Sequence, residues 1–119
     1  MNDILKHKNW TEWKPFPDPR KQEYLFAPFG YGIYQLYNEK EKVKRYVLFG
    51  RGKNLALRIT TLLPSPLGQG TRNNNEKRNY VLKNLKNILY RTIPLNDEKE
   101  CRTFESKLKA LNIHKYNES

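Results

Sequence analysis

Two neighbouring segments with the composition of β-strands constrain the fold of this chain more than any other feature. Gly32–Leu36 contains Ile and Tyr, residue types that strands favour. Val43–Phe49 alternates between two sets of side chains, as a strand with one face on a core does. The charged segment Asn38–Lys42 separates them and is longer than a two-residue hairpin turn. The sequence therefore predicts an antiparallel hairpin.

The segment after the hairpin predicts a helix and then a polar loop. Gly50–Lys53 contains two glycines and is expected to end the second strand. Asn54 is a residue type that caps helices, and the apolar residues that follow it, as far as Leu63, recur at helical spacing. Residues 64–75 are rich in Pro, Gly and Asn, which indicates a loop.

The second half of the chain predicts two more helices and a third strand. Glu76–Asn87 fits a helix, and Leu89–Ile93 fits a strand that Pro94 ends. Asp97–Glu100 has the pattern of a capping box at the start of a last helix. That helix has one apolar stripe, which consists of Cys101, Phe104, Leu108 and Leu111.

Length and aromatic content indicate one domain that carries an arm. A chain of 119 residues fits a single domain with one ordinary core. The first 30 residues contain both tryptophans, and the Pro-rich stretch Lys14–Arg20 cannot be helical. We expect residues 1–30 to form an aromatic, Pro-rich arm that packs on a body formed by residues 31–119.

The charge balance favours a polyanionic partner. The chain has 23 Lys and Arg against 12 Asp and Glu, a net charge of +11. Such a surplus on a small domain is typical of nucleic-acid binding, although a basic composition also serves solubility alone.

Composition also excludes several classes of protein. The single cysteine, Cys101, rules out an internal disulfide and a zinc site built from cysteines. No apolar run approaches the roughly 18 residues of a membrane span, and Met1–Trp10 lacks the apolar core of a secretory signal. We therefore expect a cytoplasmic protein without a membrane partner. His7 and His114 have no partner at metal-ligand spacing, so hydrolytic chemistry would rest on Tyr, Arg and Glu.

Five sequence elements occur in an order that carries a family resemblance. Gly32–Tyr34 (Gly-Ile-Tyr) begins one predicted strand, and Leu48–Gly50 ends the next. Arg58 lies on the helix that follows, Glu105 lies against the apolar stripe of the last helix, and Asn117 comes twelve positions later. From Gly32 to Asn117 the chain resembles the GIY-YIG nuclease family.

The resemblance implies a fold and a metal-dependent chemistry. The fold is α+β, with a small three-stranded, mostly antiparallel sheet flanked by helices, over residues 31–119. Tyr34 would be the general base or part of a proton relay, and Arg58 would hold the scissile phosphate. Glu105 would coordinate one Mg²⁺ or Mn²⁺, and Asn117 would orient the phosphate or Glu105. Further contacts to the nucleic-acid backbone are expected from Arg51, Lys53 and Arg72.

Each of these residues also has a purely structural interpretation. Tyr34 is a suitable packing residue between strands, and Arg58, at the margin of an apolar stripe, can extend to solvent. Glu105 can be a solvated acid on a helix, and Asn117 can belong to a frayed terminus. The same holds for the basic residues named as backbone contacts, which can be ordinary surface charge.

The sequence departs from the family pattern at two positions. Leu48 replaces the usual tyrosine of the second motif, and Tyr46, which alternation predicts on the same strand face, could substitute for it. Leu62 stands where many members carry His or Tyr, one turn after the arginine. Tyr80, or another residue of the insertion 64–80, is a candidate to replace this missing relay group.

Three hypotheses follow for the function. The first is a metal-dependent endonuclease that hydrolyses DNA phosphodiester bonds, with RNA also open as a substrate. The second is a catalytically weak or inactive nucleic-acid-binding module on the same scaffold. The third is a protein-interaction domain that docks a partner through Trp10, Trp13 and Phe16 of the arm. Separately, a lone nuclease domain could act as a dimer or be targeted by a protein partner.

Overall fold

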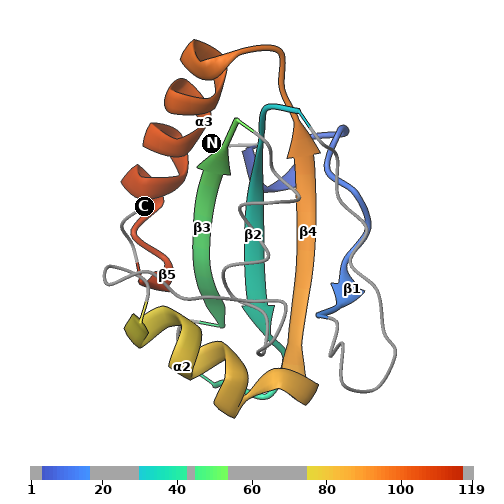
Figure 1. The fold of residues 1–119 in the computed structure, drawn as a ribbon, viewed down its shortest axis with the longest axis vertical. Coiled ribbons are helices and arrows are strands. Elements are labelled where there is room, and N and C mark those ends of the chain that lie inside the picture. Colours follow the sequence, from blue (N-terminus) through green and yellow to red (C-terminus); the bar gives the residue numbers. More distant parts are fainter. Residues whose placement is uncertain (1–3, 17–29, 43–44, 54–74, 117–119) are drawn as a thin grey trace.

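A computed structural model of the chain describes residues 4–16, 30–42, 45–53 and 75–116, with the backbone alone for 75–78 (Figure 1). These residues form an α+β fold, as predicted. Its elements are the strands β1 (Lys14–Pro15), β2 (Gly32–Asn38), β3 (Tyr46–Gly52), β4 (Ile88–Pro94) and β5 (His114–Tyr116), the helices α2 (Asn75–Lys83) and α3 (Glu98–Leu111), and the 3₁₀ turns η1 (Ile4–Lys6) and η4 (Leu85–Asn87).

The three predicted strands form the centre of the sheet. β2 pairs antiparallel with β3 on one side and with β4 on the other. The prediction that the second strand ends at Gly50–Lys53 is wrong, because β3 continues through Gly50 and Arg51 to Gly52, which pairs with Gly32. The cross-strand partner keeps these residues extended despite their glycines.

Two short strands, which the sequence did not predict, extend the sheet at its edges. β1 runs antiparallel to β4, and β5 runs parallel to β3, so the described sheet has five strands in the order β1-β4-β2-β3-β5 (Figure 1). With only two and three residues, these strands are too short for side-chain alternation to reveal them.

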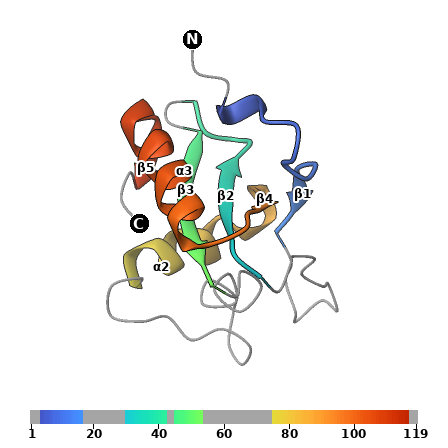
Figure 2. The same ribbon diagram turned by 90° about the horizontal axis from the view of Figure 1, so that it is seen from above.

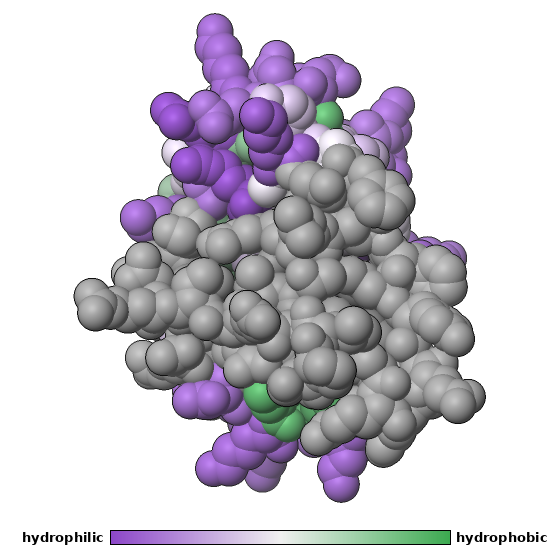
Figure 3. Space-filling model, in the orientation of Figure 1, coloured by the Kyte–Doolittle hydropathy of each residue, from purple (hydrophilic) through white to green (hydrophobic). Residues whose placement is uncertain are grey.

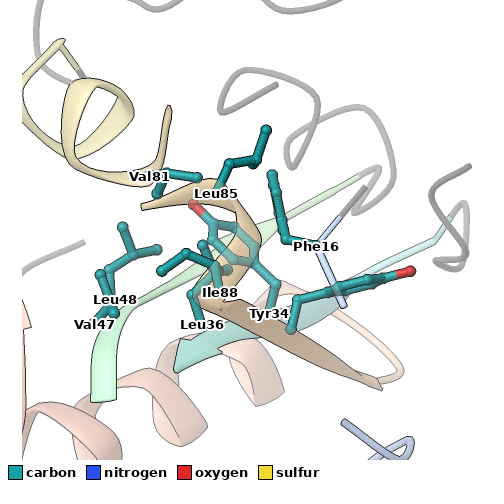
Figure 4. Packing of buried hydrophobic residues seen from close by; sticks show 9 residues of the cluster. Phe16, Tyr34, Leu36, Val47, Leu48, Val81, Leu85 and Ile88 are labelled. Carbon is teal, nitrogen blue, oxygen red and sulfur yellow. The ribbon is translucent and has the colours of Figure 1, made fainter. Parts of the chain in front are cut away.

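Buried side chains form a cluster on each face of the sheet. Seen from above, α2 and η1 lie on opposite sides of the strands (Figure 2). The α2-side cluster, most of whose members are labelled in Figure 4, contains Phe16, Tyr34, Leu36, Val47, Leu48, Val81, Leu85, Ile88 and Tyr90. The α3-side cluster contains Ile4, Ile33, Phe49, Ile93, Cys101, Phe104 and Leu108.

The predicted ends of the helices are partly confirmed. Asp97 caps α3, because its Oδ1 accepts a hydrogen bond from the Glu100 backbone N at 2.8 Å, as the capping pattern predicted. The helix ends before Asn112, whose φ of 51° is left-handed. The helix predicted over Glu76–Asn87 is shorter than expected, since its last turn is the 3₁₀ turn η4.

The described part of the N-terminal arm packs on the body. The Trp10 indole Nε1 donates a hydrogen bond to the Ile4 carbonyl at 2.8 Å, and the Trp10 ring meets Phe104 edge-on at 5.5 Å. The Phe16 ring contacts Tyr90 at 5.7 Å. The described helices include none that is both long and apolar enough to cross a lipid bilayer.

Candidate active site

Tyr34 and Gly50, from the two motifs that carry the resemblance, lie directly opposite each other. They are partners in the β2–β3 ladder, and Tyr34 is only 4% exposed. A Cβ atom at position 50 would lie 2.5 Å from the Tyr34 Oη and 2.6 Å from its Cζ. Gly50 therefore leaves room for the Tyr34 ring, because a side chain at position 50 would collide with that ring.

Glu105 is held in a largely buried site beside Arg51. The Arg51 Nη1 lies 3.5 Å from Glu105 Oε1, and the Glu105 side chain is 12% exposed. The other carboxylate oxygen, Oε2, is buried and has no hydrogen-bond partner among the described residues. The interpretation of Glu105 as a solvated helix acid is therefore wrong, because α3 turns this side chain toward β3 rather than toward water.

The surroundings of Glu105 fit a single-carboxylate site for a hard divalent cation. No group of three or more His, Cys, Asp or Glu side chains that could hold a metal occurs within the described ranges. Mg²⁺ commonly binds through one or two carboxylates and takes its other ligands from water and substrate phosphate. The unfilled Oε2 of Glu105 is the oxygen that would take part, while Oε1 faces Arg51.

Tyr34 and Glu105 belong to opposite faces of the sheet. Side chains alternate along a strand, and Tyr34 belongs to the α2-side cluster. Arg51, the partner of Glu105, pairs across the ladder with Ile33 of the α3-side cluster. The structure thus joins Arg51 to Glu105 and places Tyr34 elsewhere, over Gly50.

Two predicted backbone contacts line one small recess. A pocket of about 100 Å³ at the end of β3 is lined by Tyr31, Arg51, Gly52, Lys53, Glu98 and Cys101. Lys53 is exposed there, and the Arg51 side chain is 36% exposed. Burial raises the pKa of the Cys101 thiol. Three other predicted site residues, Arg58, Arg72 and Asn117, lie outside the described residues, as does Leu62.

The expected substitute for the missing tyrosine faces the wrong way. Leu48 is 1% exposed and points into the α2-side cluster with Val81 and Ile88 (Figure 4). A shift of register between Leu36 and Tyr37 pairs Tyr46 with Tyr37, so Tyr46 joins the opposite face, where its ring meets His114 at 5.6 Å. This irregularity breaks the alternation on which the prediction rested.

Tyr80, the candidate for the missing relay group, is engaged at the opposite end of β2 from Tyr34. Its Oη donates to Glu41 Oε2 at 3.2 Å and accepts from Asn38 Nδ2 at 3.0 Å. Asn38 is four residues along β2 from Tyr34, a separation of about 13 Å. Burial raises the pKa of Tyr80, so its phenol keeps its proton and serves to fix the Glu41 turn.

A buried polar network on the α3 side was missed from the sequence. The Arg91 guanidinium lies between the rings of Trp10 and Trp13, 4.1 and 4.5 Å from their centroids. Its Nε donates to Gln35 Oε1 at 2.8 Å, and Gln35 Nε2 lies 2.9 Å from His114 Nε2. Burial lowers the pKa of Arg91 to about 10. The sequence signal for this network was Arg91 itself, a charged residue inside the otherwise apolar predicted strand Leu89–Ile93.

Gln35 determines the protonation state that His114 needs. Because Gln35 Oε1 accepts from Arg91, its Nε2 is the donor to His114 Nε2, which must accept and therefore carry no proton. This network ties the arm, β4, β2 and β5 together.

A scan against protein-family models and searches of curated proteins and of solved structures found no match for this chain.

Proposed function

We propose that this protein is a metal-dependent endonuclease that hydrolyses DNA phosphodiester bonds. The observation that carries the proposal is the largely buried Glu105 carboxylate, which has Arg51 on one oxygen and an unfilled second oxygen. A carboxylate in this state is suited to a divalent cation, and an adjacent guanidinium is suited to the phosphate that the cation accompanies. The net charge of +11 supports a polyanionic substrate.

Each residue has a distinct role in this proposal. Glu105 would hold Mg²⁺ or Mn²⁺, which when bound stabilises the charge that develops on phosphate oxygens. Arg51 and Lys53 would attract and orient the DNA backbone at the end of β3. Arg58 would hold the scissile phosphate. Tyr34, which lies on the opposite face of the sheet from Glu105, would take part through a proton relay rather than by direct contact with the attacking water.

The test is plasmid nicking by variants that preserve the shape of the site. Wild type, Glu105→Gln and Glu12→Gln are incubated with supercoiled plasmid and Mg²⁺, Mn²⁺ or EDTA. Glu12 is the matched control because its side chain is exposed and lines neither the recess beside Arg51 nor any other described pocket. We expect nicking by wild type and Glu12→Gln, none in EDTA, and a loss of about 100-fold or more in Glu105→Gln. Undiminished nicking by a folded Glu105→Gln protein would contradict the proposal.

A second candidate function is a nucleic-acid-binding module without catalysis. Two observations favour it: Leu48 buries an aliphatic side chain where the family has tyrosine, and Tyr34 lies on the face opposite Glu105. This module would bind DNA with a steep salt dependence, because each phosphate contact releases a counterion. DNA binding without cleavage by wild type, on plasmid, branched and single-stranded substrates, would favour it over the endonuclease.

A further inference from the structure

A groove lies on the flank of α3 away from Glu105. It has a volume of about 700 Å³ and runs between α3 and η1. Its apolar lining is Ile4, Leu95 and Phe104. Its polar lining on the α3 flank includes Thr103 and Lys107, which are each two residues from Glu105 and therefore do not face the same way.

Lysines form a ridge along this groove. Lys99, Thr103 and Lys107 follow one another at intervals of four residues and are all exposed. Lys99 and Lys107 are eight residues apart, so about 12 Å of helix separates them. Lys6 of η1 faces the ridge from the other wall, and none of these lysines pairs with an acid among the described residues.

The two acids in the groove lie at one end and are already engaged. Asp97 Oδ1 accepts a hydrogen bond from the Glu100 backbone N. The backbone N and the Nδ2 of Asn96 both donate hydrogen bonds to the Glu100 carboxylate. Both acids are at the start of α3, where they stabilise the helix. The other charged residues of the lining, Lys6, Lys99 and Lys107, are all cationic.

The floor of the groove is aromatic. The Phe104 ring meets the exposed His7 ring at 6.0 Å and the Trp10 ring at 5.5 Å, both edge-on. His7 is exposed, so its ring is the stacking surface that the groove offers a nucleobase, while Phe104, only 8% exposed, supplies an apolar contact beneath it. Hydrophilic side chains gather around this end of the molecule, where α3 begins (Figure 3).

We propose that this groove binds a short single-stranded segment of nucleic acid, with phosphates on the lysine ridge and bases toward Phe104 and His7. An apolar, aromatic floor beside a row of cations matches the alternation of bases and phosphates in a single strand. The volume is in the usual range for a site that accepts a small ligand such as a nucleotide. The inference deepens the proposed function, on which its choice of partner rests, by naming single-stranded nucleic acid as a substrate class.

The experiment measures binding separately from cleavage. Fluorescence anisotropy of a labelled oligothymidylate is recorded in EDTA, where a metal-dependent nuclease is silent. The groove variant is Lys99→Glu with Lys107→Glu, and the matched control is Lys83→Glu with Lys86→Glu, which changes two exposed lysines at the end of α2 and in η4. Circular dichroism of each protein confirms that it is folded.

We expect the groove variant to bind about tenfold or more weakly and the control to change by about twofold or less. The slope of log affinity against log salt should fall by about 1.4, since each single-strand phosphate contact contributes about 0.7. Equal losses in both variants, or no loss in the groove variant, would overturn the inference, as would displacement of the oligonucleotide by poly-glutamate at equal charge concentration.

The plasmid assay and the binding assay can fail independently. Loss of oligonucleotide binding in the groove variant, with no nicking by wild type, would support the groove and contradict the endonuclease. Nicking by wild type with unchanged oligonucleotide binding in the groove variant would support the endonuclease and contradict the groove.

Discussion

The two faces of the sheet bury different kinds of side chain. The α2 face holds the aliphatic and aromatic side chains of the α2-side cluster, and Leu48 lies within it. The α3 face carries the charged groups, with Arg51 on Glu105 and with Arg91 on Gln35. The comparison shows that the α2 face is packed mainly by apolar side chains, whereas the α3 face buries charged groups with polar partners.

The resemblance to the GIY-YIG pattern stays a prediction, and the structure gives several of its positions a local setting. Gly50 leaves the space that the Tyr34 ring occupies. Leu48 fits the apolar packing of its face. Glu105 on α3 lies beside a cationic partner, Arg51.

The largest expected effect comes from placing a polar ring in the α2 face. Leu48→Tyr should lower the free energy of unfolding by about 3 kcal/mol, which combines overpacking with the burial of an unpaired hydroxyl. Urea unfolding measures this loss. Leu48→Met, which conserves volume, is the control and should cost less than about 1.5 kcal/mol. A Leu48→Tyr protein as stable as wild type would show that the α2 face accepts a polar side chain at this position.

A smaller effect is expected where Tyr34 and Gly50 meet. Gly50→Ala should cost about 2 kcal/mol, because its Cβ collides with a buried ring that has little room to move. Gly30→Ala is the matched control, since a Cβ there meets nothing within 4 Å. Thermal and urea unfolding of the two variants should differ clearly. Equal stability would show that the Tyr34 ring can leave Gly50, which would weaken the link between the two motifs.

The smallest effect tests the polar network of the α3 face through pH. The native network needs an unprotonated His114 as acceptor, so the unfolded chain binds more protons as pH falls from 7 to 5. The free energy of unfolding must therefore decrease with decreasing pH, by roughly 1 kcal/mol for the hydrogen bond that is lost.

Histidine variants separate this effect from general acid denaturation. His114→Gln should show a smaller decrease between pH 7 and pH 5 than wild type, while His7→Gln, at the exposed histidine, should follow wild type. Urea unfolding at both pH values gives the comparison. The same pH dependence in all three proteins would remove His114 as the cause.

Local sequence patterns were enough for the elements whose signals lie within a few residues. The Asp97 cap and the apolar stripe of α3 were readable because both depend on spacing along one helix. The central strands were readable from alternation and β-branched or aromatic content. The prediction for the end of β3 was wrong because pairing with β2 keeps its glycines in an extended conformation. The sequence around β3 does not contain that partner strand.

The candidate site was only partly predictable for the same reason. Glu105 and Arg51 were each named from the sequence, but their contact was not, since it joins a helix to a strand 54 positions away. The Arg91–Gln35–His114 network was missed because its members come from three strands. Tyr46 was placed on the wrong face because a shift of register cannot be seen in the sequence of one strand.

The sequence by itself determined the three central strands, the start of α3 and the apolar stripe that buries it, because each follows from short-range spacing and side-chain type. Only the tertiary structure decided which face of the sheet each side chain occupies, that β1 and β5 form, and that Glu105 meets Arg51. Alternation fixes which residues of a strand share a face. What covers that face depends on how distant elements pack together.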